Sequence, residues 1–290
     1  MTDTTQVSKY GQLEITSARN CPVDCAPMCP QKSVFRPAFE YAGPAANLLS
    51  YDDFVQALET VPRKIRISFA GFSEPFLNNR TLDMMEYARK RGHELSLFST
   101  LVGLKREQVP KLKEIAPEIF VLHEPDNRGI AKIKITQAYM ETFFEVITNG
   151  PRITNRSIMD NSFVSNERAG NCDGVAPRHV FGPIHCMAGK FLHPEFVMLP
   201  NCDLQICCMD WGLKHRMGNL LVQTWDDVVN AEPYQAILRE SRRFDGNSLC
   251  RSCVYALPVV SPKRIRMALG ETLDKIGISG QWSENRQRGR

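Results

Sequence analysis

The sequence predicts an α/β fold with a parallel sheet, followed by a smaller module rich in cysteine. Over the first 160 residues, short β-rich runs alternate with amphipathic stretches of helical length. Strand–helix alternation at this spacing predicts βαβ units, whose strands pair in parallel. From about residue 175 the composition changes, because Pro, Gly, His and Cys crowd residues 177–208. We therefore expect two regions of different architecture, the second of which is held together by a bound metal.

The expected strands are short runs of β-branched and large apolar residues. They cover residues 13–16, 64–70, 94–100 and 119–123. The expected helices cover residues 50–61, 80–92, 105–115 and 136–148, and a further helical pattern covers residues 224–241. Ser50 and Asp53 have the spacing of a capping box, Gly92 is a usual helix stop, and Pro110 is expected to interrupt its helix.

In parallel sheets, ligands bind at the carboxyl ends of the strands. Four loops occupy those positions here. They read ARNCPVDC (residues 18–25), GFSEPF (71–76), STLVG (99–103) and HEPDN (123–127). We therefore expect the functional residues to lie in these loops.

Composition limits the classes of function. The chain of 290 residues is 43% apolar and 23% charged, which allows a sizeable core. Its net charge of +4 comes from 36 basic and 32 acidic side chains, with a basic cluster at the very end, so no nucleic-acid groove is expected. The polar start is not a secretory signal, and no run approaches the roughly 20 apolar residues of a membrane span. A cytoplasmic location is expected, where ten cysteines serve metals or catalysis rather than disulfides.

The first cysteine group is the triplet Cys21, Cys25 and Cys29. A helix would place all three on one face, but Pro27 would then sit inside that helix at a cost of roughly 3 kcal/mol. A loop that turns the three sulfurs toward one point is expected instead. Three thiolates would leave one iron of a four-iron cluster open to a ligand. A zinc loop is the alternative, although structural zinc sites usually contain a CxxC pair.

The second cysteine group comprises Cys186, Cys207 with Cys208 beside it, and the CxxC pair Cys250 and Cys253. Four thiols in one segment can close a complete metal site. The CxxC pair indicates a metal but does not distinguish an iron–sulfur cluster from zinc.

Several motifs together resemble those of the radical S-adenosylmethionine superfamily. They are the cysteine triplet, FAGFSEPFLN after the second strand, and VMLPNCDLQICCMDWG, MGNLL and LCRSC toward the end. More narrowly, they resemble members with a SPASM or twitch auxiliary-cluster domain. The resemblance implies a partial (β/α)6 TIM-like barrel over residues 1–175. It also implies a SPASM/twitch-type domain over residues 176–262, followed by a C-terminal helix and basic tail over residues 263–290.

The resemblance also implies roles for individual residues. Cys21, Cys25 and Cys29 would hold a [4Fe–4S] cluster that binds S-adenosylmethionine. The expected cofactor contacts are Gly71 and Ser73 at the methionine end, Glu74 at its ammonium group, Ser99 and Thr100 at the nucleoside, and His123 and Asp126 at the next strand end. An auxiliary [4Fe–4S] cluster would take Cys186, Cys207, Cys250 and Cys253, with Cys208 as the alternative to Cys207.

The chain departs from the family pattern at three points. The triplet is CxxxCxxxC instead of CxxxCxxC, so the loop must accommodate one additional residue before the third cysteine. Ser73 stands at a usual glycine, and Cys202 stands where the family has glycine. Cys172, Cys202 and Cys208 are then spare thiols, each either a small buried apolar residue or a hydrogen donor.

The resemblance implies that a 5′-deoxyadenosyl radical removes hydrogen from a small polar substrate of the sugar or aminocyclitol kind. Oxidation of an alcohol carbon is the expected outcome, with the auxiliary cluster accepting an electron. Arg168 is expected to anchor or deprotonate the substrate, or else to form a salt bridge, and Cys172 is the expected hydrogen donor if the reaction is an epimerisation. A flavodoxin or ferredoxin would supply the electron. The alternatives are an epimerase, a peptide maturase, and a non-catalytic iron–sulfur or zinc protein.

Overall fold

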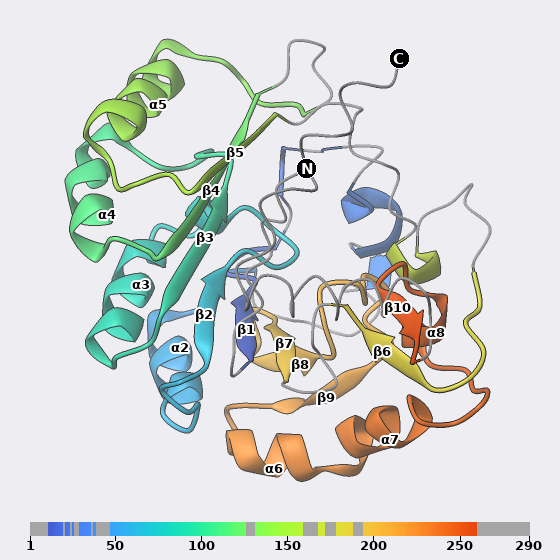
Figure 1. The fold of residues 1–290 in the computed structure, drawn as a ribbon. Coiled ribbons are helices and arrows are strands. Elements are labelled where there is room, and N and C mark those ends of the chain that lie inside the picture. Colours follow the sequence, from blue (N-terminus) through green and yellow to red (C-terminus); the bar gives the residue numbers. More distant parts are fainter. Residues whose placement is uncertain are drawn as a thin grey trace, which may run out of the picture.

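The computed structural model describes most of the chain between residues 11 and 259. The described residues are 11–19, 21–23, 25, 29–35, 37–38, 47–125, 131–158, 168–171, 178–187 and 194–259. They form an eight-stranded sheet, most of it parallel, with helices along one side of its first five strands (Figure 1). The predicted C-terminal helix and tail over residues 263–290 lie outside the described residues.

The parallel part of the sheet follows the chain in order. Its strands are β1 (Gln12–Ile15), β2 (Arg66–Phe69), β3 (Leu95–Ser99), β4 (Ile119–Glu124) and β5 (Asn155–Ile158). They pair in parallel, as the strand–helix alternation predicts, and their order in the sheet is β5-β4-β3-β2-β1. Strand β5 was not identified from the sequence. The carboxyl ends of the five strands therefore meet along one edge.

The sixth parallel strand differs from the expected succession. Strand β7 (Glu195–Met198) pairs with β1 and not with β5. All four of its residues are buried, and the strand lies inside the sheet, between β1 and β8. Strands β8 (Asp203–Gln205) and β9 (Arg216–Asn219) then continue the sheet in antiparallel fashion. The sheet therefore runs from the barrel region into the cysteine-rich region.

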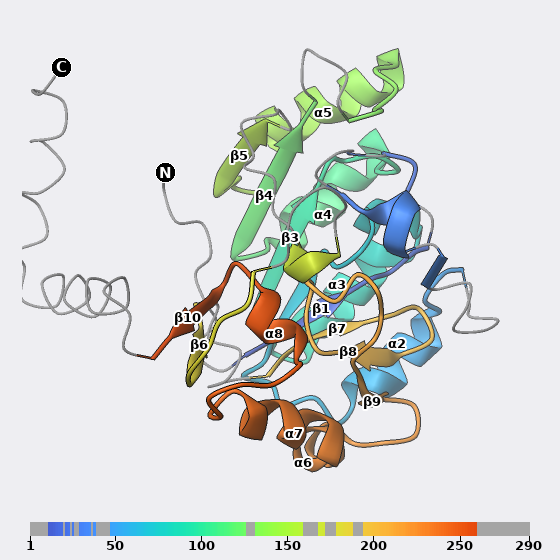
Figure 2. The same cartoon turned by 90° about the vertical axis from the view of Figure 1, so that its right-hand side faces the viewer.

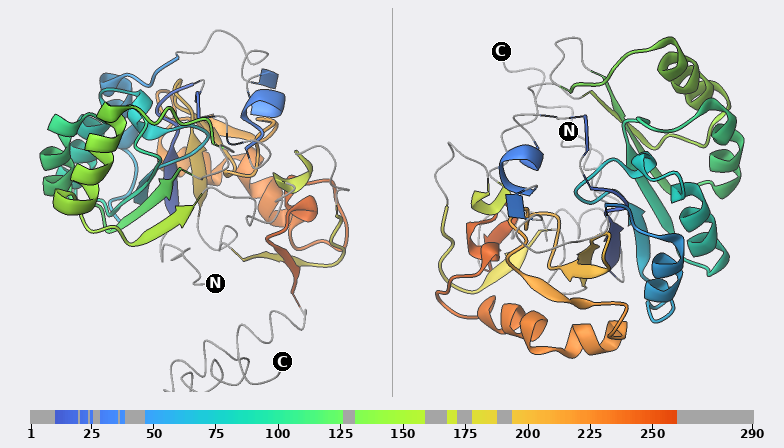
Figure 3. Two further views of the ribbon diagram at one scale, coloured as in Figure 1. Left: turned by 90° about the horizontal axis from the view of Figure 1, so that it is seen from above. Right: turned by 180° about the vertical axis from the view of Figure 1, so that it is seen from behind.

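Among the described residues, four α-helices lie between the first five strands along the chain. They are α2 (Tyr51–Leu58), α3 (Thr81–Lys90), α4 (Val109–Ile115) and α5 (Gln137–Asn149). Viewed from above, all four lie on the side of the sheet away from the C-terminal elements (Figure 3). Within the described part of the chain, no helix has both the length and the apolar character that crossing a bilayer requires.

Local signals in the sequence explain the helix ends. Ser50 caps α2 by accepting a hydrogen bond from the backbone amide of Asp53, as the spacing predicts. Pro110 does not interrupt a helix. Residues 106–108 form a separate 3-10 turn, η3 (Arg106–Gln108), and Pro110 lies in the first turn of α4, where its missing amide hydrogen costs nothing.

The C-terminal elements pack beside the barrel strands. Helices α6 (Trp225–Asn230) and α7 (Glu232–Glu240) replace the single helix expected over residues 224–241, because the chain is extended at Ala231 and Pro233 starts the second helix. Strand β6 (Ile184–Cys186) pairs with β10 (Ala256–Pro258), and α8 (Leu249–Ser252) lies against them (Figure 2).

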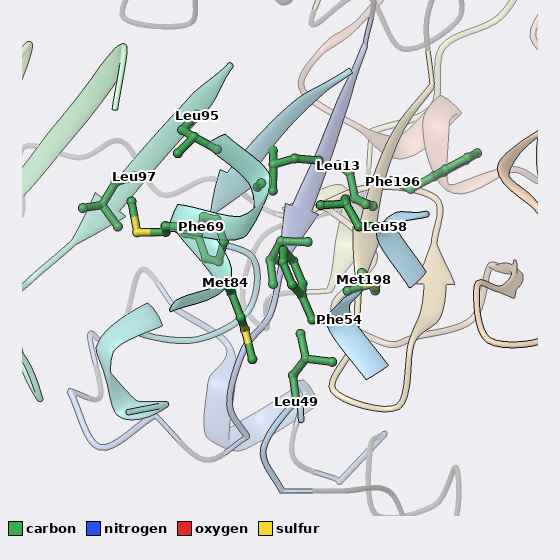
Figure 4. Packing of buried hydrophobic residues seen from close by; sticks show 14 of the residues in the cluster. Leu13, Leu49, Phe54, Leu58, Phe69, Met84, Leu95, Leu97, Phe196 and Met198 are labelled. Carbon is green, nitrogen blue, oxygen red and sulfur yellow. The ribbon is translucent and has the colours of Figure 1, made fainter. Parts of the chain in front are cut away.

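One hydrophobic core joins the two regions. Leu13, Phe54 and Phe69 are fully buried between the sheet and its helices (Figure 4). Burying each such side chain stabilises the fold by roughly 1.5–3 kcal/mol. The same core continues through Phe196 on β7, whose ring lies 5.3 Å from that of Trp225. The barrel strands and the C-terminal helices are therefore held together by shared packing.

Candidate functional site

A cavity of about 220 Å³, the central cavity, lies at the carboxyl ends of β1 to β4. Its lining residues are Cys21, Val23, Cys25, Cys29, Ala70, Gly71, Phe72, Ser73, Glu74, Phe98, Ser99, Thr100, His123, Arg168 and Trp211. The structure thus brings together the cysteine triplet, Arg168 and most of the residues expected to bind the cofactor. Asp126 and Cys172 lie outside the described residues.

Within the cysteine loop the structure describes the three cysteines, but not residue 24 or residues 26–28 between them. The Cys29 amide donates to the Cys25 carbonyl at 3.1 Å, and a π-turn, η1 (Gln31–Phe35), follows. Burial raises the pKa of the Cys21 thiol to about 11, while backbone amides of Val23 and Glu74 donate toward the sulfur and lower it. A buried sulfur with amide donors suits a thiolate bound to a positively charged iron centre. The three-thiol donor set therefore fits a cluster.

Gly71 holds the turn after β2 against β1. Its φ angle of +68° lies in the left-handed region, and a Cβ there would overlap the Thr16 hydroxyl and lie 3.1 Å from the Thr16 amide nitrogen. The next amide, that of Phe72, donates to the same Thr16 hydroxyl at 3.1 Å. Only glycine meets both demands, so this turn can approach the cysteine loop closely.

Glu74 is 4% exposed, and both of its carboxylate oxygens accept two hydrogen bonds. Oε1 accepts from the Ser99 hydroxyl at 2.7 Å and the Phe76 amide at 3.3 Å. Oε2 accepts from the amide and the hydroxyl of Thr100, at 2.8 and 2.7 Å. Burial raises the pKa of Glu74, and these four donors oppose the rise. Ser99 and Thr100, expected at the nucleoside, therefore orient this carboxylate.

The carboxyl end of β3 is strained. Leu101, a buried residue, has a φ angle of +64°, which costs a non-glycine residue roughly 1–2 kcal/mol. Its amide donates to the Ser99 hydroxyl at 2.8 Å, and the Tyr139 hydroxyl donates to the Thr100 carbonyl at 3.0 Å. These bonds hold the strand end in place. Such strain often accompanies a functional site.

His123 lies at the end of β4, where it was expected. Burial lowers its pKa from 6.5 to about 4, so the imidazole is neutral at neutral pH. Its ring meets that of Phe98 edge to face, with centroids 6.4 Å apart. A neutral imidazole here can donate one hydrogen bond and accept another.

The far wall of the central cavity comes from two later segments. Arg168 begins the short turn η4 (Arg168–Gly170), and its guanidinium carbon lies 5.9 Å from the ring centroid of Trp211. The Asn171 side-chain amide donates to the carbonyls of Arg168 and Met209, at 2.8 and 2.9 Å, and so ties the two segments together. Trp211 lies in the CCMDWG motif, yet its spacing gave no sign of a role at the cavity.

A second cavity, the C-terminal cavity, has a volume of about 30 Å³. Cys186, Cys207, Cys250 and Cys253 all line it, with mainly apolar neighbours. Cys208 does not line it; this residue packs with Cys29 against the ring cluster of Phe35, Phe72 and Trp211. The structure therefore brings together the four thiols expected for the auxiliary site and separates Cys207 from Cys208. Among the described residues, no three His, Cys, Asp or Glu side chains are arranged to hold a single metal ion.

Arg251, between the two cysteines of the CxxC pair, was not identified from the sequence. Its side chain is fully buried, and its guanidinium donates to the carbonyls of Val180, Gly182, Glu240 and Arg243 at 2.8–3.0 Å. These bonds tie α8 to the segment that leads into Cys186. Arg251 therefore fixes the cysteine-bearing segments relative to one another.

Cys202 lies apart from both cavities. It is fully buried in the main core, and its φ angle is +62°, the conformation that explains why the resembled family has glycine there. Its sulfur lies 3.8 Å from the Asp53 carbonyl oxygen, and burial raises the pKa of the thiol to about 12. The structure favours a packing role for this cysteine.

Comparison with known proteins identifies the C-terminal region. Residues 190–254 match the SPASM family model, described as an iron–sulfur cluster-binding domain. This range contains Cys207, Cys250 and Cys253 but not Cys186. No curated protein sequence matches the chain.

Solved structures share the fold over most of the chain. The complex of BtrN with AdoMet and 2-DOIA has a TM-score of 0.58 at 15% identity, over 86% of this chain and 94% of that one. AnSMEcpe with bound AdoMet has a TM-score of 0.57 at 9% identity, over 95% and 97%. AnSMEcpe with AdoMet and the Cp18Cys peptide has a TM-score of 0.55 at 10% identity, over 84% and 86%. The predicted α/β fold with a C-terminal SPASM-type region is therefore confirmed.

Proposed function

We propose that this chain, which combines a SPASM iron–sulfur domain with the fold of radical S-adenosylmethionine enzymes, oxidises a small polar substrate by radical chemistry. The observation that carries the proposal is the central cavity, where Cys21, Cys25 and Cys29 share one space with the Glu74 turn. Three thiols and a buried carboxylate, at the carboxyl ends of parallel strands, suit a cluster and an amino-acid cofactor.

In this proposal Cys21, Cys25 and Cys29 hold a [4Fe–4S] cluster, and S-adenosylmethionine lies beside it. When bound, these groups supply a 5′-deoxyadenosyl radical that removes hydrogen from an unactivated C–H bond. The protein orients the reactants and excludes water. Val23, Phe72 and Phe98 line the cavity with apolar surface.

Glu74 is proposed to accept the methionine ammonium group. Its four acceptor positions are already filled, two by backbone amides and two by the hydroxyls of Ser99 and Thr100. A hydroxyl can rotate away, whereas a backbone amide cannot. The Ser99 or Thr100 hydroxyl would therefore give up its bond to Glu74 when an ammonium group binds there, and could then donate to another part of the cofactor.

The C-terminal cavity is proposed to hold the auxiliary cluster through Cys186, Cys207, Cys250 and Cys253. Bound there, such a cluster supplies a one-electron acceptor. Arg251 keeps the cysteine-bearing segments in register by its four hydrogen bonds. In this proposal the barrel domain covers residues 1–175 and the auxiliary-cluster domain covers residues 176–262.

The two spare thiols that the structure describes, Cys202 and Cys208, support oxidation rather than epimerisation. Epimerisation needs a thiol that returns hydrogen to the substrate, but neither Cys202 nor Cys208 lines the central cavity. Oxidation of an alcohol removes one hydrogen atom, one proton and one electron from the substrate. Arg168 lines the cavity and is proposed to hold the oxygen that loses the proton. Cys172 remains the donor to test if a product proves to be an epimer.

A small sugar-like or aminocyclitol-like molecule is the proposed substrate, because BtrN with bound 2-DOIA shares the fold. A peptide is the second candidate, because the fold is also shared with anSMEcpe in complex with a peptide. Reduction by flavodoxin or ferredoxin and a cytoplasmic location complete the proposal.

The test is anaerobic purification followed by iron and sulfide analysis and an assay for 5′-deoxyadenosine. Two four-iron clusters give about eight irons per chain, and the reduced protein releases 5′-deoxyadenosine from S-adenosylmethionine. Zinc in place of iron, or a reduced protein that leaves S-adenosylmethionine intact, would refute the proposal. An oxidised product two mass units lighter identifies a dehydrogenase. A product of unchanged mass with one solvent deuterium identifies an epimerase.

A further inference from the structure

Two residues that line the central cavity each carry a buried donor atom to which the proposed function gives no partner. One is the indole Nε1 of Trp211, a residue that is 6% exposed, and the other is the Ser73 hydroxyl. Neither atom has a hydrogen-bond partner in the structure. Buried polar atoms are almost always bonded, so each such exception calls for an explanation.

The indole of Trp211 is held in a fixed orientation. Its ring meets that of Phe72 at 4.8 Å between centroids and that of Phe35 at 5.9 Å, and these two phenyl rings lie 5.0 Å apart. Phe35 follows the cysteine loop, and Phe72 precedes Ser73 in the turn after β2. The three rings therefore pack the indole against the two segments that line the cofactor side of the cavity.

An amino-acid zwitterion needs acceptors for its ammonium group and donors for its carboxylate. Glu74 supplies only acceptors while it is ionised, and the indole N–H supplies only a donor. Ser73 is the neighbour of Glu74 in the chain, so a hydroxyl donor lies next to the acceptor. The cavity therefore offers complementary groups to both charged ends of a methionine moiety.

We propose that Trp211 Nε1, together with the Ser73 hydroxyl, donates hydrogen bonds to the carboxylate of bound S-adenosylmethionine. This inference rests on the proposed function, because it assumes that the central cavity binds that cofactor. Trp211 belongs to residues 190–254, the SPASM match. The iron–sulfur domain thereby contributes directly to the cofactor site of the barrel.

The test compares two ligands that differ only in the carboxylate. S-adenosylmethionine and decarboxylated S-adenosylmethionine are titrated into cluster-loaded protein without oxygen, and the dissociation constants are measured by calorimetry. Trp211→Phe keeps an aromatic ring but removes the N–H group. It should raise the dissociation constant of S-adenosylmethionine about tenfold, as expected when a hydrogen bond to a charged group is lost. The dissociation constant of the decarboxylated ligand should change by less than about twofold. Ser73→Ala should act in the same direction.

Trp225→Phe is the matched control. Trp225 is also buried, packs on Phe196 and lines neither cavity. This substitution should leave both dissociation constants unchanged. If Trp211→Phe weakens both ligands equally, or neither, the inference is overturned. Wild-type protein that binds no S-adenosylmethionine would overturn the proposed function instead.

A second replacement at position 211 separates loss of the N–H donor from loss of packing, because phenylalanine is smaller than tryptophan. Benzothienylalanine at position 211 keeps the size of the indole and replaces only N–H by sulfur. It should reproduce the tenfold loss for S-adenosylmethionine with iron content equal to that of the wild type. Full affinity in this protein would show that the ring, and not the donor, matters, and the inference would fail.

Discussion

The central cavity and the C-terminal cavity both gather cysteine sulfurs, but in different surroundings. The central cavity has three thiols, about 220 Å³ of space, and polar side chains from several strand ends. The C-terminal cavity has four thiols and about 30 Å³, with mainly apolar neighbours. Three ligands with space beside them leave room for a reactant, whereas four ligands in a tight apolar pocket saturate whatever they bind. This contrast agrees with the proposed function, in which the central cavity holds the reactants and the C-terminal cavity holds the electron acceptor.

The sharpest way to break this comparison is to remove one thiol from each site. Cys25→Ala should lower the iron content from about eight to about four per chain and reduce 5′-deoxyadenosine formation to background. Cys253→Ala should lower the iron content equally but leave S-adenosylmethionine cleavage in place. Both variants are measured by iron analysis and by chromatography of the nucleoside product. If both variants lose 5′-deoxyadenosine formation, or if both keep it, the two sites do not have the separate roles proposed for them.

The C-terminal site should depend on Arg251 for its integrity. Arg251→Met leaves one buried and three partly buried carbonyls without their donor and should lower the free energy of unfolding by roughly 3–5 kcal/mol. Denaturant titration of the cluster-loaded protein measures the loss. Arg216→Met is the control, since Arg216 forms a solvent-exposed ion pair with Asp203, and it should cost about 0–1 kcal/mol. Equal losses would contradict the role assigned to Arg251.

The stability of the turn beside the central cavity should depend on Gly71, and a comparison with Gly182 separates the effect of steric contact from that of backbone strain. Gly71 and Gly182 both have left-handed φ angles, +68° and +80°, but only Gly71 has neighbours where a Cβ would lie. Gly182→Ala should cost about 1 kcal/mol of stability, for backbone strain alone. Gly71→Ala should cost roughly 2–3 kcal/mol, because the methyl group also meets Thr16, and it should weaken S-adenosylmethionine binding. A Gly71→Ala protein as stable as Gly182→Ala would show that the contact with Thr16 relaxes freely.

His123 predicts the smallest effect, a pH dependence confined to the central site. Its pKa falls from 6.5 to about 4 on folding, so between these values the unfolded chain binds a proton that the folded chain does not. Stability from this group is complete above pH 6.5 and is lost as the pH falls toward 4. Between pH 8 and pH 5, the free energy of unfolding of His123→Gln should therefore fall by about 2 kcal/mol less than that of the wild type, as measured by denaturant titration at each pH. Parallel stability curves for the two proteins would show that the imidazole titrates normally.

The sequence predicted those features that depend on neighbouring residues. The cap at Ser50, the helix stop near Gly92 and the strands over residues 13–16 and 94–100 follow from local preferences, and the structure has them within a residue or two. Pro110 was misjudged because proline breaks a helix interior but suits a helix start. The motifs also brought most of the expected cofactor residues to the central cavity.

Features that depend on distant segments were missed. The pairing of β7 with β1 joins residues far apart in the chain, and no local pattern encodes it. The ring of Trp211 meets side chains from three other segments, at Phe35, Phe72 and Arg168. The guanidinium of Arg251 donates to two other segments, residues 180–182 and 240–243. Cys207 and Cys208 could not be told apart by spacing, because adjacent residues differ only in the side to which the backbone directs them.

The position of β1 has a consequence for the order in which the protein is made. Gln12 pairs with Arg66 on one side and with Glu195 on the other, so β1 lies inside the sheet although it is synthesised early. Until the ribosome has delivered β7, one side of β1 has unpaired backbone groups, and such an edge can pair with another chain. The strand therefore gains its second neighbour only when synthesis has reached residues 195–198.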